Sequence, residues 1–120
     1  MAVSVTNQST PLGSKIVKDT AATNEAVKDT TGGSGILYMV EIHNGHSSPV
    51  YFKLVNAATA TVGTTAATFV LECPASDSRS YVFPEGIDFS VGFTHWCVTG
   101  AAESSTGAPD TPPTVYYVTT

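Results

Sequence analysis

The sequence predicts an all-β protein, an antiparallel β-sandwich or jelly-roll-like barrel with an extended N-terminal arm. Apolar residues recur at every second position in several short runs, which is the period of a strand with one buried face. Gly, Pro and Asn separate these runs, so that a turn signal comes about every ten residues. A chain of 120 residues fits one domain, and each sheet in it must cover its apolar face.

The charge content is low and argues against two classes of partner. Only 12% of the residues are charged, and the formal net charge is -5. Nucleic acid and anionic membranes both require a patch of Lys and Arg, but the five basic residues are scattered. No apolar run approaches the roughly 20 residues of a membrane helix, and Met1 to Asn7 lacks the features of a signal peptide. We expect a protein made in the cytoplasm. Its weakly charged surface suits contact with neighbours, and a chance outcome in a Thr-rich β protein is the equally favoured alternative.

The N-terminal quarter differs from the rest of the chain. Residues Met1 to Ser34 are dominated by Ser, Thr, Ala, Asn and Gly, a composition that predicts an arm with little core of its own. We expect the arm to end at Ser34, to be followed by a β-sandwich domain at residues 35–120, and to have room for one or two strands of its own. Its apolar residues Ile16, Val17 and Val27 are candidate contacts with a partner protein or a neighbouring subunit. Pairing within the chain and pairing between chains both stay open.

The strongest local pattern is a predicted β-hairpin. Gly35 to Gly45 and Pro49 to Val55 both alternate, and Asn-Gly favours a turn between them. Ile36, Tyr38, Val40 and Ile42 share one expected face, as do Val50, Phe52 and Leu54. The second faces carry Met39 and Tyr51, which we expect to contact the arm or a neighbouring subunit because these faces are too mixed for solvent.

Four further strands and two loops follow. The predicted strands are Thr68–Cys73, Arg79–Phe83, Ile87–Val98 and Thr114–Thr120, with a turn at Pro84–Gly86. Asn56 to Ala67 reads as a surface loop because its residues are small. Gly100 to Pro113 is a candidate contact or specificity loop. Tyr116 in the last strand is a further candidate for subunit contact.

The residues offer little for catalysis or metal binding. His43 and His46 lie three apart near the hairpin tip, but no third ligand is evident, and solvent-facing turn histidines are the favoured interpretation. His95 and Cys97 share one strand face, which favours a core strand over a thiol-imidazole pair. We therefore expect a protein that is not an enzyme, with no catalytic residue, no cofactor and no metal ligand.

Cysteines and aromatic residues are assigned to packing. Cys73 and Cys97 lie in apolar strands and are expected to be buried free thiols. Aromatic side chains could instead stack on a host glycan if they are exposed, and core or interface use is favoured. The candidates for glycan stacking are Tyr51, Trp96, Tyr116 and Tyr117.

Several of these segments also carry a resemblance to a known group of proteins. The sequence between Gly35 and Thr99 contains Leu-Tyr-x-Val-Glu-Ile, then Val-Gly-Thr-Thr, then Phe-Pro-Glu-Gly-Ile. With the strands around them, these segments resemble small β-sandwich structural proteins of tailed bacteriophages, including cyanophages. The matching residues are strand cores and turns, so the resemblance implies a fold and a broad role and no catalytic residue.

The resemblance implies a virion structural protein. The expected role is a capsid decoration or cement protein on the phage head, in contact with the major capsid protein and with its own copies, as a homotrimer. The arm would lie across neighbouring capsid subunits, and its deletion would leave a folded domain. A tail, baseplate or head-fibre component and a carbohydrate-binding attachment module are the alternatives.

Overall fold

A computed structural model describes residues 3–7 and 14–120 and contains eight strands. The all-β class and the antiparallel sandwich are confirmed, because two antiparallel sheets pack face to face. The strands are β1 (Val3–Asn7), β2 (Lys15–Asp19), β3 (Gly35–Asn44), β4 (Val50–Asn56), β5 (Phe69–Cys73), β6 (Asp77–Phe89), β7 (Phe93–Val98) and β8 (Thr114–Thr119).

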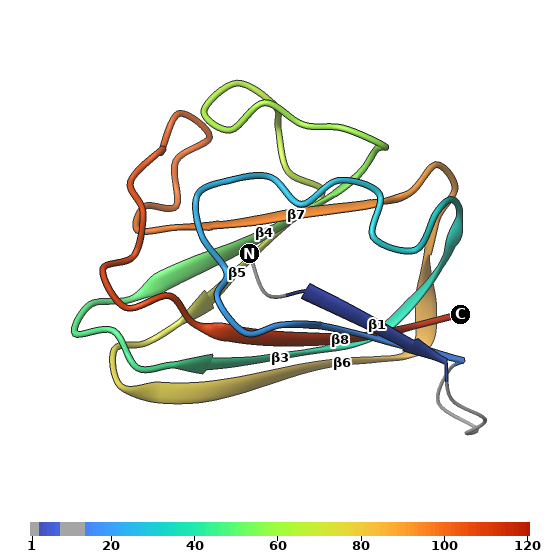
Figure 1. The fold of residues 1–120 in the computed structure, drawn as a ribbon, viewed down its shortest axis with the longest axis horizontal. Helices are drawn as coiled ribbons and strands as arrows, with labels where there is room; N and C mark the ends of the chain where they lie inside the picture. The colour runs from blue at the N-terminus through green and yellow to red at the C-terminus, as the bar shows by residue number, and fades with distance from the viewer. Residues whose placement is uncertain (1–2, 8–13) are drawn as a thin grey trace.

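The two sheets form the layers seen in Figure 1, with β4 and β7 above β8, β3 and β6. The five-stranded sheet has the order β1-β2-β8-β3-β6, and the three-stranded sheet has the order β5-β4-β7. Strands that are far apart in sequence are therefore neighbours, as when β2 pairs with β8. The last strand lies in the middle of the larger sheet.

The segment between β2 and β3 extends the smaller sheet along the edge of β7. Val27 and His95 exchange two backbone hydrogen bonds of 2.8 and 3.0 Å, and the Cys97 amide donates to the Thr23 carbonyl at 2.8 Å. The Thr30 amide also donates to the carbonyl of Phe93. Because these bonds satisfy the backbone of β7, the segment takes the place of a fourth strand.

With this segment included, the topology is that of a jelly roll. One layer is β2-β8-β3-β6, and the other is the segment 22–30 followed by β7-β4-β5. Two interlocked four-stranded layers of this kind form a jelly roll, and β1 is an additional edge strand. The boundary expected at Ser34 thus falls inside one packed unit, and residues 14–34 pair within their own chain.

The predicted hairpin does not form. β3 pairs with β6 and β8, whereas β4 pairs with β5 and β7. The connection between β3 and β4 therefore crosses from one sheet to the other. The alternation was predicted correctly in part, since Val40, Ile42, Phe52 and Leu54 are all buried in the core between the sheets. Periodicity reports which face is buried and does not report which strand is the neighbour.

A bulge changes the face on which the first residues of β3 lie. The register shifts between Leu37 and Met39, so that Tyr38 is an extra residue opposite β8. Leu37 is fully buried in the core as a result, although alternation had placed it on the other face with Met39. A bulge resets the two-residue period, and a sequence pattern alone does not reveal this.

The turn expected at Pro84–Gly86 is also wrong. These residues lie inside β6, where the register to β3 shifts, and Gly86 has a φ of 77°. A Cβ atom at Gly86 would collide with the side chain of Ile36, so the glycine is needed both for its φ and for space. The chain reverses instead at residues 90–92, which divides the long strand predicted at Ile87–Val98.

One core lies between the sheets, and a second apolar cluster lies outside the smaller sheet. Val55, Trp96 and Val98 form this second cluster, and residues of the loop after β4 pack on them: Ala57, Ala60, Val62 and Ala67. That loop was expected at the surface and lies there, since none of its residues is buried, and four of its small side chains also pack on the second cluster. Trp96 is only 1% exposed.

Candidate functional site

Half of the predicted contact residues meet on one surface. Ile16 of β2, Tyr116 of β8 and Met39 of β3 all point away from the core, on the outer face of the five-stranded sheet, and each is half-buried. They come from three strands that are far apart in sequence and adjacent in the sheet. We call this surface, formed by the outward residues of β1, β2, β8, β3 and β6, the open face.

The other predicted contact residues lie elsewhere. Val17 is fully buried in the core, and Val27 is bonded to the edge of β7. Tyr51 lies on the outer face of the three-stranded sheet, where its hydroxyl donates to Glu72 at 3.1 Å. Met39 and Tyr51, expected on one contact surface, are therefore on opposite sides of the sandwich.

The strand register builds two rows across the open face. The apolar row is Thr6, Ile16, Val118, Met39 and Val82, and the polar row is Ser4, Lys18, Tyr116, Glu41 and Ser80. Val82 is 56% exposed. Ile16 and Met39 are half-buried and Val118 is buried, so Val82 is the exposed apolar member of the row. A sheet face in contact with water normally carries polar residues, so apolar side chains at four neighbouring positions are unusual there.

Charges flank the aromatic ring in the middle of the polar row. The Lys18 ammonium lies 5.3 Å from the centre of the Tyr116 ring, within the range of a cation-π interaction. On the other side, His43 packs edge-on against the same ring at 5.7 Å and lies 3.6 Å from the Glu41 carboxylate. The polar row is thus positive on one side of β8 and negative on the other.

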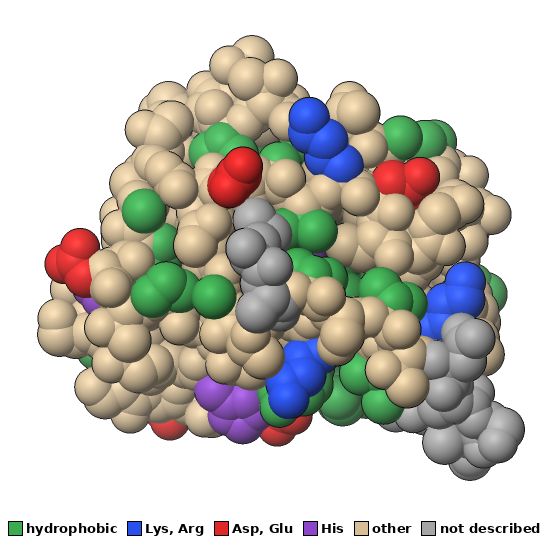
Figure 2. All heavy atoms as spheres, viewed as in Figure 1, with side chains coloured by type: hydrophobic (Ala, Val, Ile, Leu, Met, Phe, Trp, Pro, Cys, Tyr) green, Lys and Arg blue, Asp and Glu red, His purple; other side chains and the backbone are tan. Residues whose placement is uncertain are grey.

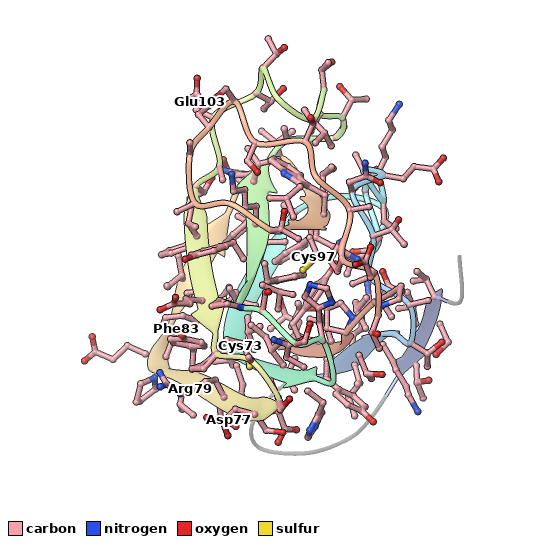
Figure 3. The ribbon with its side chains drawn as sticks, turned by 90° about the vertical axis from the view of Figure 1, so that its left-hand side faces the viewer. Cys73, Asp77, Arg79, Phe83, Cys97 and Glu103 are labelled. Atoms are coloured by element: carbon pink, nitrogen blue, oxygen red, sulfur yellow. The ribbon has the colours of Figure 1, made fainter. Side chains whose placement is uncertain are left out.

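Loops cover the opposite outer face. In Figure 1 the loops after β4 and β7 gather above the smaller sheet, and no described segment runs beneath the larger one. The loop after β7 is held by Lys53, whose ammonium donates to the Ala102 carbonyl at 2.6 Å. Burial lowers the pKa of Lys53, which is only 1% exposed, and nearby Glu103 (Figure 3) partly offsets this shift.

A buried polar network joins the N-terminal segment to both sheets. His95 of β7 is fully buried, and its Nε2 lies 2.8 Å from the carboxylate of Asp19 on β2. Its Nδ1 lies 2.9 Å from the hydroxyl of Tyr117, which lies 2.6 Å from the hydroxyl of Thr30. Burial raises the pKa of Tyr117. Sequence reasoning placed His95 in a core strand and missed its partners, because Asp19 precedes it by 76 residues.

The two turn histidines do not form a metal site with their surroundings. His46 is buried, with its ring accepting a hydrogen bond from the Thr111 amide, whereas His43 is exposed on the open face. Among the described residues, no group of three or more His, Cys, Asp or Glu side chains is placed to hold a metal ion. The solvent-facing assignment is therefore wrong for His46.

The sequence search also missed a serine beside His43. The Ser78 hydroxyl lies 2.9 Å from Nδ1 of His43, in a hollow of about 400 Å³. Acyl transfer by such a pair requires a third group that orients the imidazole and N–H donors for an oxyanion. Glu41 is too distant for a hydrogen bond at 3.6 Å, and the Ser78 amide already donates to the Asp77 carboxylate. The strand register accounts for the pair, since His43 and Ser78 are directly opposite each other.

The cysteine prediction is confirmed. Cys73 and Cys97 are both buried and unbridged, and Figure 3 shows both inside the molecule. Burial raises the pKa of Cys97 to about 12. A thiol with such a pKa stays protonated at neutral pH and is a poor nucleophile.

Comparison with known proteins identifies no relative. No protein family, curated protein or solved structure matches the chain. A helix with the length and hydrophobicity to span a membrane is not found among residues 3–7 and 14–120.

Proposed function

We propose that the protein is a non-enzymatic structural protein of a phage virion, and specifically a decoration or cement protein on the head. The proposed partners are the major capsid protein and further copies of the same chain. The proposal draws on the resemblance between Gly35 and Thr99 and on the open face, which provides a surface for a protein partner.

The observation that carries the proposal is the apolar row of the open face. Ile16, Val118, Met39 and Val82 are cross-strand neighbours on the outside of the sheet. Val82 is exposed, Ile16 and Met39 are half-buried, and Val118 between them is buried. An apolar row that stays partly exposed on the outside of a sheet is a candidate protein contact. Figure 2 shows few and scattered charged side chains on the visible side of the molecule, in keeping with the low charge content of the sequence.

The proposed means of attachment differs from the one expected from the sequence. An arm that adds strand-type backbone bonds to neighbouring subunits needs free backbone groups, but β2 pairs with β8, and Thr23, Val27 and Thr30 form backbone hydrogen bonds with β7 of the same chain. The open face therefore replaces this part of the arm as the proposed contact surface for a protein partner. The homotrimer stays a prediction.

Purified particles of the phage that encodes the chain test the proposal. Mass spectrometry of the particles is expected to detect the chain, and cryo-electron microscopy is expected to place it at symmetry-related positions on the outside of the head. Density for the chain at the tail or baseplate would instead support the tail alternative. Absence of the chain from intact particles would overturn the proposal.

Deletion of the gene provides a second measurement. Heads without the protein are expected to break at a lower temperature or after a milder osmotic shock than wild-type heads. Adding back the purified chain should restore resistance, whereas adding back a Met39→Asp chain should not. Equal resistance with and without the protein would contradict a cement role.

A further inference from the structure

We infer that the open face is a two-fold interface between two copies of this chain, with the β8 strands stacked on each other. The inference rests on the self-association part of the proposed function, and it replaces the predicted homotrimer with a two-fold pair of copies. It rests on the arrangement of residues across the five-stranded sheet, in which β8 is the middle strand.

The symmetry of the strand order makes the open face suited to pairing with itself. A two-fold axis that runs along β8, between two facing copies, places β2 of one copy over β3 of the other. The same axis places β1 over β6. Each strand of the sheet thereby meets a strand of the partner. Such an interface is isologous, because both copies use the same surface.

The charges of the polar row are complementary in this arrangement. Lys18 and Glu41 lie on either side of Tyr116, at one level of the sheet. The two-fold axis brings Lys18 of each copy opposite Glu41 of the other, which gives two equivalent ion pairs. Within a single chain, Lys18 forms no ion pair among the described residues, so its charge is available to a partner.

The apolar row is complementary as well. Ile16 of each copy lies opposite Met39 of the other, on either side of Val118, which is already buried within each chain. At the ends of the row, Val82 meets the methyl-bearing side chain of Thr6. Face-to-face sheets pack in this way with their strands about 30° apart, and the contact removes the exposed Val82 from water.

Charge-reversed variants of the full chain test the inference by sedimentation velocity over a range of concentrations. The wild-type chain is expected to change, as concentration rises, from a monomer of 12.4 kDa to a species of twice that mass. Lys18→Glu and Glu41→Lys should each associate at least tenfold more weakly than the wild type, because each substitution places two like-charged contacts in the interface.

A mixture of the two variants gives the decisive result. One chain then carries Glu at both positions and the other carries Lys at both, so a mixed pair has opposite charges at every contact. Equimolar mixing should restore the double-mass species, and the double variant Lys18→Glu/Glu41→Lys should form it alone. Recovery on mixing depends on contact between chains and cannot come from a change within one chain.

Matched controls separate the interface from general charge effects and from folding. Lys28→Glu and Glu25→Lys change residues of the segment after β2, outside the open face, and should associate as the wild type does. Circular dichroism melting checks that every variant is folded. A monomeric wild type at all concentrations, a species of three times the chain mass, or failure of the mixture to pair would overturn the inference. These measurements need no particle, so they can fail independently of the proposed function.

Discussion

The outer faces of the two sheets differ in what covers them. On the three-stranded sheet, Trp96 and Val98 lie beneath loops of the same chain, and Lys53 fixes one of these loops. On the five-stranded sheet, Met39 and Val82 lie outside with no described loop beneath them in Figure 1. Both faces carry apolar side chains, but only one is completed within the chain. The face that stays open is where a partner is expected.

The largest effect should follow removal of the N-terminal segment, which belongs to both layers. Deletion of residues 1–34 removes Val17 from the core and Asp19 from His95, and it bares the edge of β7. We expect the remaining chain not to unfold cooperatively in urea or heat. A cooperative transition in the truncated chain would show that the segment is the detachable arm expected from the sequence.

The next largest effect should come from the covered face. Trp96→Ala removes a buried aromatic side chain from the second cluster and should lower the free energy of unfolding by about 3 to 5 kcal/mol. Trp96→Phe is the control, because it keeps an aromatic ring, and the indole N–H has no hydrogen-bond partner among the described residues. Self-association should be unchanged in both folded variants. Urea denaturation and sedimentation measure the two quantities.

Alkaline pH should lower the free energy of unfolding, and the buried thiol of Cys97 should account for part of this loss. Burial raises the pKa of Cys97 from its ordinary value of 9.0 to about 12 in the folded chain, so between these values the folded state binds more protons than the unfolded state. Stability therefore falls as pH rises through this window, by roughly 3 kcal/mol at pH 11. Tyr117, whose pKa is also raised by burial, adds to this loss above its ordinary value of 10.0.

Cys97→Ala isolates the thiol in this experiment. Urea unfolding under reducing conditions at pH 8 and at pH 11 should show a smaller loss of stability for the variant than for the wild type. Lys53 has a lowered pKa and acts in the opposite direction, but it is present in both chains and cancels in the difference. An equal loss of stability in the wild type and in Cys97→Ala would contradict the assignment of this pH dependence to the Cys97 thiol.

The smallest effect on stability should come from the open face. Val82→Thr keeps the shape of an exposed side chain and should change the free energy of unfolding by no more than about 0.5 kcal/mol. The same change should weaken association of the chain, since the apolar row loses its outermost member. A large loss of stability with unchanged association would reverse the roles assigned to the two faces.

The sequence predicted most of the strand-forming segments, but it did not predict which strands are neighbours. Alternation at Val40 and Ile42 identified buried faces correctly, because burial acts on each strand separately. The partner of a strand depends on contacts between distant segments, and so the hairpin was predicted where β3 and β4 lie in different sheets. Gly86 was taken for a turn residue because a bulge and a turn both favour the same backbone angles.

The sequence predicted some of the single residues of the candidate site, but it did not predict that they form one surface. Ile16 was identified as an apolar residue of the arm, Met39 as a residue on a mixed strand face, and Tyr116 as a residue of the last strand. Their meeting on one side of the sheet depends on the position of β8 between β2 and β3. The same fact explains why Lys18, Glu41 and Val82 were missed, since each gains significance only from a neighbour on another strand.

The central position of β8 also has a consequence for how the chain folds during synthesis. β2 and β3 both need Thr114–Thr119 as their neighbour, and the ribosome makes these residues about 100 residues after β2. Until then, two strand edges of the larger sheet stay unpaired, and such edges favour aggregation. A topology with contacts this distant also folds slowly, in milliseconds to seconds. We expect nascent chains that stop before Thr114 to be protease-sensitive, and the sheet to close only after β8 has left the ribosome.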